Sequence, residues 1–440
     1  MMPVFVDHAP FQSWGRIVRR SYPTARPRFA ADVGSLFTAG DRPATLLPVG
    51  MGRSYGDSCL NAGGGLISMR GLDRLMEIDE AEEDFTAQAG MTLSEALQHL
   101  VPRQLFMPVL PGTRYATLGG AIANDVHGKN HLMAGSFGCH IRRLELVRSD
   151  GSRRVLGPGD PSGLFEATIA GLGLTGVITW AELGVRDEDS SFLDAEDIAF
   201  STLDEYFSLM AESAHFEQRV AWIDCTRPGR GVFSRGRFLD DGKLDPHEDR
   251  IKLTAPGFTP GFLLNGLTLK AFNALYGAAK TVKKGPQRVH YAAFFFPLDS
   301  IGEWNRVYGG AGFYQYQCVV PPTASRDAVA AMLEAIAKAG DGSMLAVLKE
   351  FGPARSPGLL SFPMEGTTLA LDFRNRGEKT LKLFERLDAI VAEAKGRLYP
   401  AKDGRIPAKA FQTMYPQWEQ VERLRDPAIS SDFWARVTAV

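Results

Sequence analysis

The sequence predicts an α+β protein built from a small N-terminal α+β unit and a larger part with a mainly antiparallel sheet backed by helices. Residues 1 to about 105 carry short strand signals and one helix signal, Leu93 to Leu100, entered through Thr92. Two glycine-rich loops lie about sixty residues apart, and strand and helix signals alternate beyond residue 189. With 440 residues, the chain is long enough for two or three domains with their own cores.

Local signals place the individual elements. The dipeptide Asp150-Gly151 predicts a hairpin turn between a strand that contains Arg143 and a return strand that begins at Arg153. The polar, acidic stretch Asp187 to Asp194 marks the expected boundary of the second part. The other expected elements are the strands Ala44 to Leu47, Gly65 to Met69, Gly176 to Leu183, Arg219 to Asp224, Ser343 to Lys349 and Gly366 to Phe373, and the helices Leu164 to Ile169, Arg326 to Ala339 and Lys379 to Lys395.

Composition excludes several classes of protein. Forty-nine basic and 51 acidic residues give a formal net charge of −2, so no global electrostatic attraction for nucleic acid is expected. The four cysteines are scattered without metal-ligand spacing, which favours reduced thiols in the cytoplasm and no metal site. No apolar run resembles a signal peptide or reaches the length of about eighteen residues that a spanning helix needs, so we expect a cytoplasmic chain without either.

The segment Met107 to His140 cannot build a core, because it is rich in glycine, small polar residues and histidine. Glycines let backbone N–H groups approach a bulky polyanion, so the segment reads as a cradle for a phosphorylated cofactor. Its spacing fits neither G-x-x-x-x-G-K-[ST] nor G-x-G-x-x-G after a strand. A long, tightly turned surface loop is the alternative reading.

A second glycine loop, Leu47 to Asp57, favours the cofactor reading. It follows an apolar strand signal and reads LPVGMGRSYGD, where Arg53 offers a cation for a phosphate. Two such loops in one chain predict a dinucleotide site.

The motifs in these loops resemble the flavin domain of the vanillyl-alcohol-oxidase superfamily. The resemblance rests on PVGMGRSYGD, on Pro111-Gly112-Thr113 and on GGAIANDVHGKNH from Gly119 to His131. Within that superfamily the chain is similar to the decaprenylphosphoryl-β-D-ribose 2-oxidase family, the flavoprotein half of the epimerase that makes the arabinose donor of bacterial cell envelopes. The similarity recurs almost to the C-terminus, in LYPAKD from Leu398 to Asp403.

The resemblance implies an FAD-binding domain over residues 1–188, a substrate domain over 189–396, and a C-terminal return to the FAD domain over 397–440. In covalent relatives a histidine precedes the serine of the first loop, where this chain has Arg53, so FAD is expected to bind without a covalent bond; attachment through another residue stays open. The expected cofactor-binding residues are Gly50, Met51, Gly52, Arg53, Ser54, Tyr55, Gly56, Pro111, Gly112, Thr113, Leu118, Gly119, Gly120, Ala123, Asn124, His127, Gly128, Ser136, Gly176, Val177 and Tyr399.

Two residues are expected to be catalytic. Oxidation of a secondary alcohol at a flavin needs a base for the hydroxyl proton, and lysine can serve when burial or nearby cations lower its pKa. Lys402 matches the family's active-site lysine, and His127 matches the histidine at the flavin edge. Without the resemblance, Lys402 would read as a surface residue.

The expected substrate residues lie mainly on strands. Gln315 and Gln317 alternate with Tyr316, so both amides point to one face, which suits either a hydroxyl-rich sugar or solvent. Lys349 is expected to hold a phosphate. The full expected set is Tyr55, Lys129, Trp222, Gln315, Gln317, Val347, Lys349, Phe351, Thr368, Ala370 and Lys402. The family has Asn and Cys where this chain has Thr368 and Ala370, so its detailed sugar contacts are expected to differ and thiol chemistry at position 370 is ruled out.

Segment 258–288 combines apolar residues with the basic residues Lys280, Lys283, Lys284 and Arg288. This pattern suits either the interface of an anionic membrane or a core helix with a solvated basic end. The resemblance favours a mobile, membrane-facing cover, because the family's substrate carries a polyprenyl tail, and it places the protein at the inner membrane.

The resemblance thus implies FAD-dependent oxidation of the 2-hydroxyl of a polyprenylphosphoryl ribose. A short-chain dehydrogenase/reductase partner would complete the epimerisation, and a quinone or a similar acceptor would reoxidise the flavin. Two alternatives remain at this stage: a soluble alditol or sugar-lactone oxidase, and a flavin-binding protein without turnover.

Overall fold

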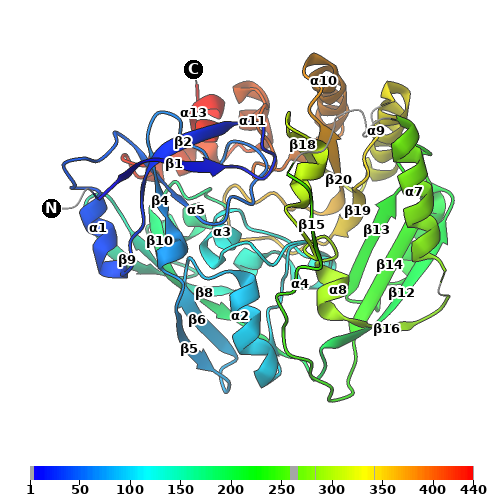
Figure 1. Cartoon of the computed structure of the whole chain (residues 1–440), viewed down its shortest axis with the longest axis horizontal. Helices are drawn as coiled ribbons and strands as arrows, with labels where there is room; N and C mark the ends of the chain where they lie inside the picture. The colour runs from blue at the N-terminus through cyan, green and yellow to red at the C-terminus, as the bar shows by residue number, and fades with distance from the viewer. Residues whose placement is uncertain (1–3, 258–265, 283, 341, 440) are drawn as a thin grey trace.

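The computed structural model describes residues 4–257, 266–282, 284–340 and 342–439. The N-terminal strands and the small antiparallel sheet lie on one side of the molecule, and a large sheet with its covering helices lies on the other (Figure 1). The C-terminal helices return to the N-terminal strands (Figure 1). Helices and antiparallel sheets occupy the chain together, which confirms the predicted α+β class.

The N-terminal sheet carries the first glycine loop. Its strands, in spatial order, are β1 (Val6–Gln12), β2 (Arg19–Ala25), β4 (Gly65–Ser68) and β3 (Leu46–Val49). The last two run parallel, with Leu46 opposite Gly65 and Val49 opposite Ser68. This pairing places the strand two residues later than the predicted Ala44 to Leu47, and it delivers the chain directly into the loop that starts at Gly50.

The second sheet holds the loop from Met107 to His140 against its face. It is antiparallel throughout, in the order β5 (Leu75–Asp79), β6 (Asp84–Gln88), β10 (Val177–Gly184), β8 (Ile141–Val147) and β9 (Arg153–Leu156). The predicted hairpin is present between the last two strands, where Gly151 adopts a φ of +81°. Helix α2 (Leu93–Leu100) begins as predicted, because the Thr92 hydroxyl accepts the Glu95 N–H while the Glu95 carboxylate accepts the Thr92 N–H.

The large sheet has eight strands, and every neighbouring pair is antiparallel. Its order is β16 (Gln287–His290), β12 (Phe192–Phe200), β14 (Gly231–Phe238), β13 (Gln218–Ile223), β19 (Ala346–Phe351), β20 (Gly366–Arg374), β18 (Phe313–Val320) and β21 (Arg397–Leu398). Helices α6 (Leu203–Glu212), α9 (Ser325–Ala339) and α10 (Glu378–Glu393) pack on this sheet. The predicted helices at 326–339 and 379–395 therefore form within two residues of their expected bounds.

Strand β19 starts three residues later than the predicted Ser343. The Ser343 hydroxyl accepts hydrogen bonds from the backbone N–H groups of Leu345 and Asp372, at 3.1 and 3.0 Å. These bonds hold a turn before the strand, which local propensity did not indicate.

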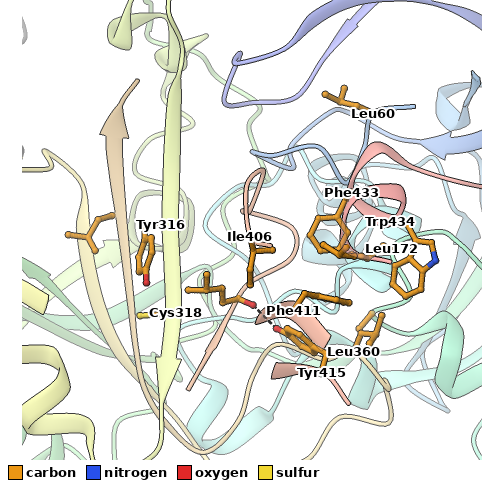
Figure 2. Close-up of a cluster of buried hydrophobic side chains, with 14 of the residues drawn as sticks. Leu60, Leu172, Tyr316, Cys318, Leu360, Ile406, Phe411, Tyr415, Phe433 and Trp434 are labelled. Carbon is orange, nitrogen blue, oxygen red and sulfur yellow. Dashed lines mark hydrogen bonds between the residues drawn. The ribbon is translucent and has the colours of Figure 1, made fainter. Parts of the chain in front are cut away.

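The C-terminal helices pack against the N-terminal unit. Figure 2 shows Leu172 beside Phe433 and Trp434 of the final segment, and Leu60 and Phe411 belong to the same buried cluster. The helices are α11 (Ala408–Met414), α12 (Trp418–Leu424) and α13 (Asp432–Val437). The final segment and the N-terminal unit therefore share one buried core. The predicted domain boundaries at residues 188 and 396 stay a prediction.

Part of segment 258–288 forms helix α7 (Gly266–Lys280) on the large sheet; residues 258–265 and 283 lie outside the described residues. Asn273 donates to Asp224 at 2.8 Å, and the Tyr276 ring packs on Trp222 with centroids 5.0 Å apart. On its outer side Leu275 is 72% exposed. No helix in the described part of the chain is long and apolar enough to cross a bilayer.

The remaining elements are short connections between these layers. They are α1 (Val33–Leu36), α3 (Leu118–Ala123), α4 (His131–Ala134), α5 (Leu164–Thr168), α8 (Tyr291–Phe295), the strand pairs β7 (Leu105–Phe106) with β11 (Arg186–Asp187) and β15 (Leu253–Thr254) with β17 (Ile301–Gly302), and 3-10 helices at Ala30–Asp32, Met69–Gly71, Val101–Arg103, Phe137–His140 and Trp304–Tyr308.

Candidate active site

A long cavity runs between the two glycine loops and the large sheet. Its lining comes from the first loop, the second loop, the segment from Tyr399 to Lys402, and side chains of strands β18, β19 and β20. Elements from the whole length of the chain therefore meet at one place, which is the arrangement expected for a cofactor and a substrate held side by side.

The two glycine loops touch each other at this cavity. Thr117 caps α3, because its hydroxyl accepts the N–H of Gly120 at 3.2 Å. A Cβ atom at Gly50 would lie only 2.3 Å from the Thr117 hydroxyl oxygen. The absence of a side chain at Gly50 thus allows the loops to close on each other, as the first-loop motif required.

The loops present hydrogen-bond donors that lack protein acceptors. Among the described residues, the N–H groups of positions 51 to 54 and of Gly112 and Thr113 donate to no other residue. The buried Arg53 Nε and Ser58 Oγ also have no partner there, and both residues line the cavity. Several unpaired donors and one guanidinium in a glycine cradle fit the pyrophosphate and ribityl groups of FAD.

Gly112 provides a direct check of this fit. A Cβ at this position would meet nothing within 4 Å, and Gly112 lines the cavity, so a side chain there would occupy cavity space. We expect Gly112→Val to weaken FAD binding by at least about tenfold, or roughly 1.4 kcal/mol, without lowering the melting temperature of the apoprotein. Flavin titration followed by fluorescence would measure the change.

The matched control for that variant is Gly63→Val, because Gly63 also has open space around it but lies outside the cavity lining. Equal FAD affinity in Gly112→Val and Gly63→Val would contradict the placement of FAD along the second loop.

A buried aspartate outside the predicted set of site residues holds the second loop in shape. The Asp125 carboxylate accepts from the hydroxyls of Ser136 and Ser361, at 2.9 and 2.5 Å, and from the Gly138 N–H at 2.7 Å. Asp125 adopts a φ of +41°, and burial raises its pKa. Its contacts explain the position of Ser136, which supports the loop from behind and does not line the cavity.

His127 lies at the centre of a polar group at one end of the cavity. Lys349 Nζ donates to His127 Nδ1 at 2.7 Å and to the Gly128 carbonyl at 3.0 Å, and the Gln317 amide lies 3.1 Å from His127 Nε2. Burial, followed by the charge of Lys349, lowers the pKa of His127 well below its usual value. His127 is therefore neutral at physiological pH, with the Gln317 amide nitrogen at its Nε2 and the Lys349 amine at its Nδ1.

The pKa of Lys349 is also shifted from its usual value. Burial, followed by the charges of Lys129 and Lys402, lowers its pKa to about 7. An amine with this pKa gains its full positive charge when an anion binds beside it. The position thus suits a phosphate, although the phosphate-binding role stays a prediction.

Lys402 faces the cavity from the segment after β21. Its Nζ lies 4.0 Å from the centroid of the Tyr55 ring. Burial lowers the pKa of Lys402 to about 8, and the nearby Asp372 carboxylate opposes that shift. Lys402 is therefore partly in its free-base form near neutral pH, as proton abstraction requires.

Most predicted residues line the cavity, and nine do not. Those outside the lining are Gly56, Leu118, Gly128, Ser136, Val177, Lys129, Trp222, Phe351 and Thr368. Lys129 points to the Phe294 carbonyl and ring, and Trp222 donates to the Met344 carbonyl at 3.1 Å beneath α7. Phe351 packs on the His127 ring with centroids 4.7 Å apart, and Gln317 lies 3.4 Å from the Thr368 hydroxyl. Their direct contacts with substrate or cofactor stay predictions.

The cavity also includes residues outside the predicted set of site residues. They are Trp14, Pro48, Val49, Ser58, Cys59, Met69, Ala89, Ala116, Thr117, Val126, Leu172, Gly173, Ile178, Leu298, Asp299, Trp304, Leu345, Asp372 and Ala401. Arg53 stacks on Trp14 at 3.9 Å, and Trp14 meets Trp304 edge to face at 5.7 Å. These contacts join three segments that are distant in the sequence, so no local pattern could predict them. Asp372 is different, because a single charged residue within an apolar strand is a local sign of a buried functional group.

The comparisons agree with the geometry. A family model described as "FAD binding domain" matches residues 24–157. The chain is 38% identical to the decaprenylphosphoryl-beta-D-ribose oxidase of Mycolicibacterium smegmatis over 397 residues, which is 86% of this chain and 85% of that protein. The chain belongs to this oxidase family.

As a member of the decaprenylphosphoryl-ribose oxidase family, the protein is an FAD-dependent oxidoreductase. An uncharacterized protein of Streptomyces coelicolor, from the 5' region of mprA, is 30% identical over 76% of this chain and 95% of its own length. Mouse L-gulonolactone oxidase is 27% identical over 30% of this chain and 29% of its own length. The similarity to the Mycolicibacterium oxidase therefore covers far more of the chain than the similarity to the lactone oxidase does.

Proposed function

We propose that this oxidoreductase converts the 2-hydroxyl of a polyprenylphosphoryl-β-D-ribose to a ketone, the first half of an epimerisation to the arabinose donor of cell-envelope polysaccharide. The observation that carries the proposal is the 38% identity to a decaprenylphosphoryl-ribose oxidase across both parts of the chain. The cavity supports it, because Lys402, two glutamine amides and the Lys349–His127 pair line one continuous space. An amine base, amides for hydroxyls and a cation for a phosphate match the three chemical parts of a phosphosugar.

In the proposed reaction, bound FAD supplies the acceptor for the hydride that leaves C2 of the sugar. Lys402 takes the proton of the 2-hydroxyl, so the C–H and O–H bonds break as the C=O bond forms. Gln315 and Gln317 bind the sugar hydroxyls, and Lys349 holds the phosphate. Neutral His127, held by Lys349 and Gln317, positions the flavin edge without adding a positive charge beside Lys402.

The lipid tail and the partners follow from the same proposal. Exposed Leu275 and Val282 lie close in sequence to Lys280 and Lys284, and this surface would rest on the inner membrane from the cytoplasmic side. A short-chain dehydrogenase/reductase would reduce the ketone on the opposite face of the sugar. A quinone or a similar acceptor would reoxidise the flavin.

The test is anaerobic absorbance of the purified FAD-loaded protein mixed with a short-chain polyprenylphosphoryl ribose, and separately with ribitol and with a sugar lactone. We expect the lipid-linked sugar alone to bleach the flavin's main visible band. Bleaching by ribitol or the lactone and not by the lipid-linked sugar would transfer the protein to the soluble oxidases. Absence of bleaching with all three would indicate flavin binding without this turnover.

A further inference from the structure

We infer that Asp372 is a positioning residue of the proposed oxidation, and that its carboxylate is the buried anionic counterpart that keeps Lys402 a competent base. The inference rests on the proposed function and adds a residue outside the predicted set of site residues. It is drawn from the register of the large sheet and from the contacts of Asp372.

The sheet register places Asp372 in the cavity. Strand β20 pairs with β18 so that Asp372 lies directly opposite Gln315, and the two side chains therefore share one face. The Gln315 amide donates to Asp372 Oδ1 at 2.7 Å, and the Tyr308 hydroxyl lies 3.4 Å from Oδ2. Asp372 is 1% exposed and lines the cavity together with Gln315, Tyr55 and Lys402.

The backbone of Asp372 is fixed as well. Its N–H donates to the Ser343 hydroxyl at 3.0 Å and lies 3.3 Å from the Leu345 carbonyl. The Tyr308 ring stacks on Phe313 at 4.2 Å, and Phe313 meets Tyr55 edge to face at 5.4 Å. A charged carboxylate held by this many contacts in a buried site is unusual unless it serves a neighbouring charge.

Lys402 is that neighbour. Burial raises the pKa of Asp372 to about 7, while Gln315, Lys402 and Tyr308 favour its charged form. Burial lowers the pKa of Lys402 to about 8, and Asp372 raises it. The two groups thus interact and titrate in the same range, so the charge of one decides the protonation of the other.

Among the described residues that line the cavity, the other carboxylate is Asp299, which interacts with Arg114 and Arg53 and is not among the groups that shift the pKa of Lys402. Burial raises the pKa values of Tyr55 and Tyr308 well above their usual range, so both phenols are neutral. His127 is neutral, and the Lys349 amine is either neutral or positively charged, so neither group is an anion. Asp372 is therefore the group whose charge favours the ammonium form of Lys402 after it has taken the hydroxyl proton.

Without the carboxylate, nothing would oppose the effect of burial, and the pKa of Lys402 would be lower. A base with a lower pKa abstracts a proton less readily, and its ammonium form would remain unpaired in the cavity. Asp372 thus acts through Lys402 and through Gln315, and it does not need to touch the reacting carbon.

The test compares wild-type holoenzyme with Asp372→Asn, which keeps the size of the side chain and an acceptor for Gln315 but removes the charge. In stopped-flow reduction by the lipid-linked sugar, the wild-type rate should rise with pH to a plateau with a midpoint near 8. The Asn variant should show a midpoint at least one pH unit lower and a plateau rate at least tenfold lower. Gln315→Met keeps the carboxylate and is expected to leave the midpoint unchanged while KM rises.

Thermal unfolding gives a readout that needs no substrate. A carboxyl whose pKa is raised in the folded state contributes stability that is present below its unfolded pKa and is lost as pH rises through its folded pKa. Wild-type protein should therefore lose stability between about pH 4 and pH 7 relative to Asp372→Asn, which should melt at the same or a higher temperature at pH 8.

The possible results distinguish a failure of the proposed role of Asp372 from a failure of the proposed oxidation. An unchanged pH midpoint in Asp372→Asn, or a melting temperature lowered equally at all pH values, would show that Asp372 is only structural and would overturn the inference. If the lipid-linked sugar fails to reduce the wild-type flavin, the proposed function fails, and the melting curves alone then decide whether Asp372 is a buried charge that the fold accommodates at a loss of stability.

Discussion

Lys402→Met is expected to slow flavin reduction by the lipid-linked sugar by roughly 10²- to 10⁴-fold, the usual contribution of a positioned general base. Methionine has a similar length and fills the space beside Tyr55, but it cannot accept the hydroxyl proton. Because the unpaired donors of the two glycine loops do not involve Lys402, FAD content should be unchanged. Anaerobic stopped-flow absorbance at saturating substrate measures the effect.

The control is Lys338→Met, which removes an exposed lysine on α9 that pairs with Glu334 at 2.6 Å. This variant should retain the wild-type rate and FAD content. A Lys402→Met enzyme that reduces its flavin within about threefold of the wild-type rate would show that another group takes the proton.

Gly56→Ala is expected to have the largest effect on stability. A Cβ at Gly56 would lie 1.5 Å from the Asp403 carbonyl oxygen and 2.2 Å from its carbon, so backbone would meet backbone and no side chain could move aside. We expect a loss of about 3 kcal/mol or more in the free energy of unfolding, together with loss of FAD. Urea unfolding and the flavin-to-protein absorbance ratio measure both effects.

The consequence extends to the active site, because the first loop and the Lys402 segment pack against each other at this close approach. The Tyr55 N–H donates to the Ala401 carbonyl at 2.9 Å, and Arg436 bridges Asp57 and Asp403 at 2.8 and 3.1 Å. Gly63→Ala, where a Cβ meets nothing within 4 Å, is the control and should be neutral. Wild-type stability in Gly56→Ala would mean that the two segments do not approach so closely in solution.

Features that depend on neighbours in the chain could be predicted from the sequence. The capping box at Thr92, the hairpin turn at Gly151 and the helices at 326–339 and 379–395 arise from contacts within a few residues. The same holds for the glycine loops, whose composition indicates a polyanion whatever surrounds them. The alternation that directs Gln315 and Gln317 to one face is also local, and both residues line the cavity.

Contacts between distant segments were decided only by the tertiary structure. Trp222 and Lys129 are covered by α7 and by Phe294, which a strand or loop signal does not reveal. Asp372 becomes a site residue only because β20 pairs with β18 and the segment after β21 brings Lys402 to the same cavity. The sequence alone determined the cofactor class and the local elements, because those depend on short-range backbone chemistry. The partners of each buried charge depend on which strands pair in the sheet. Long-range packing decides this pairing, so the sequence alone does not reveal it.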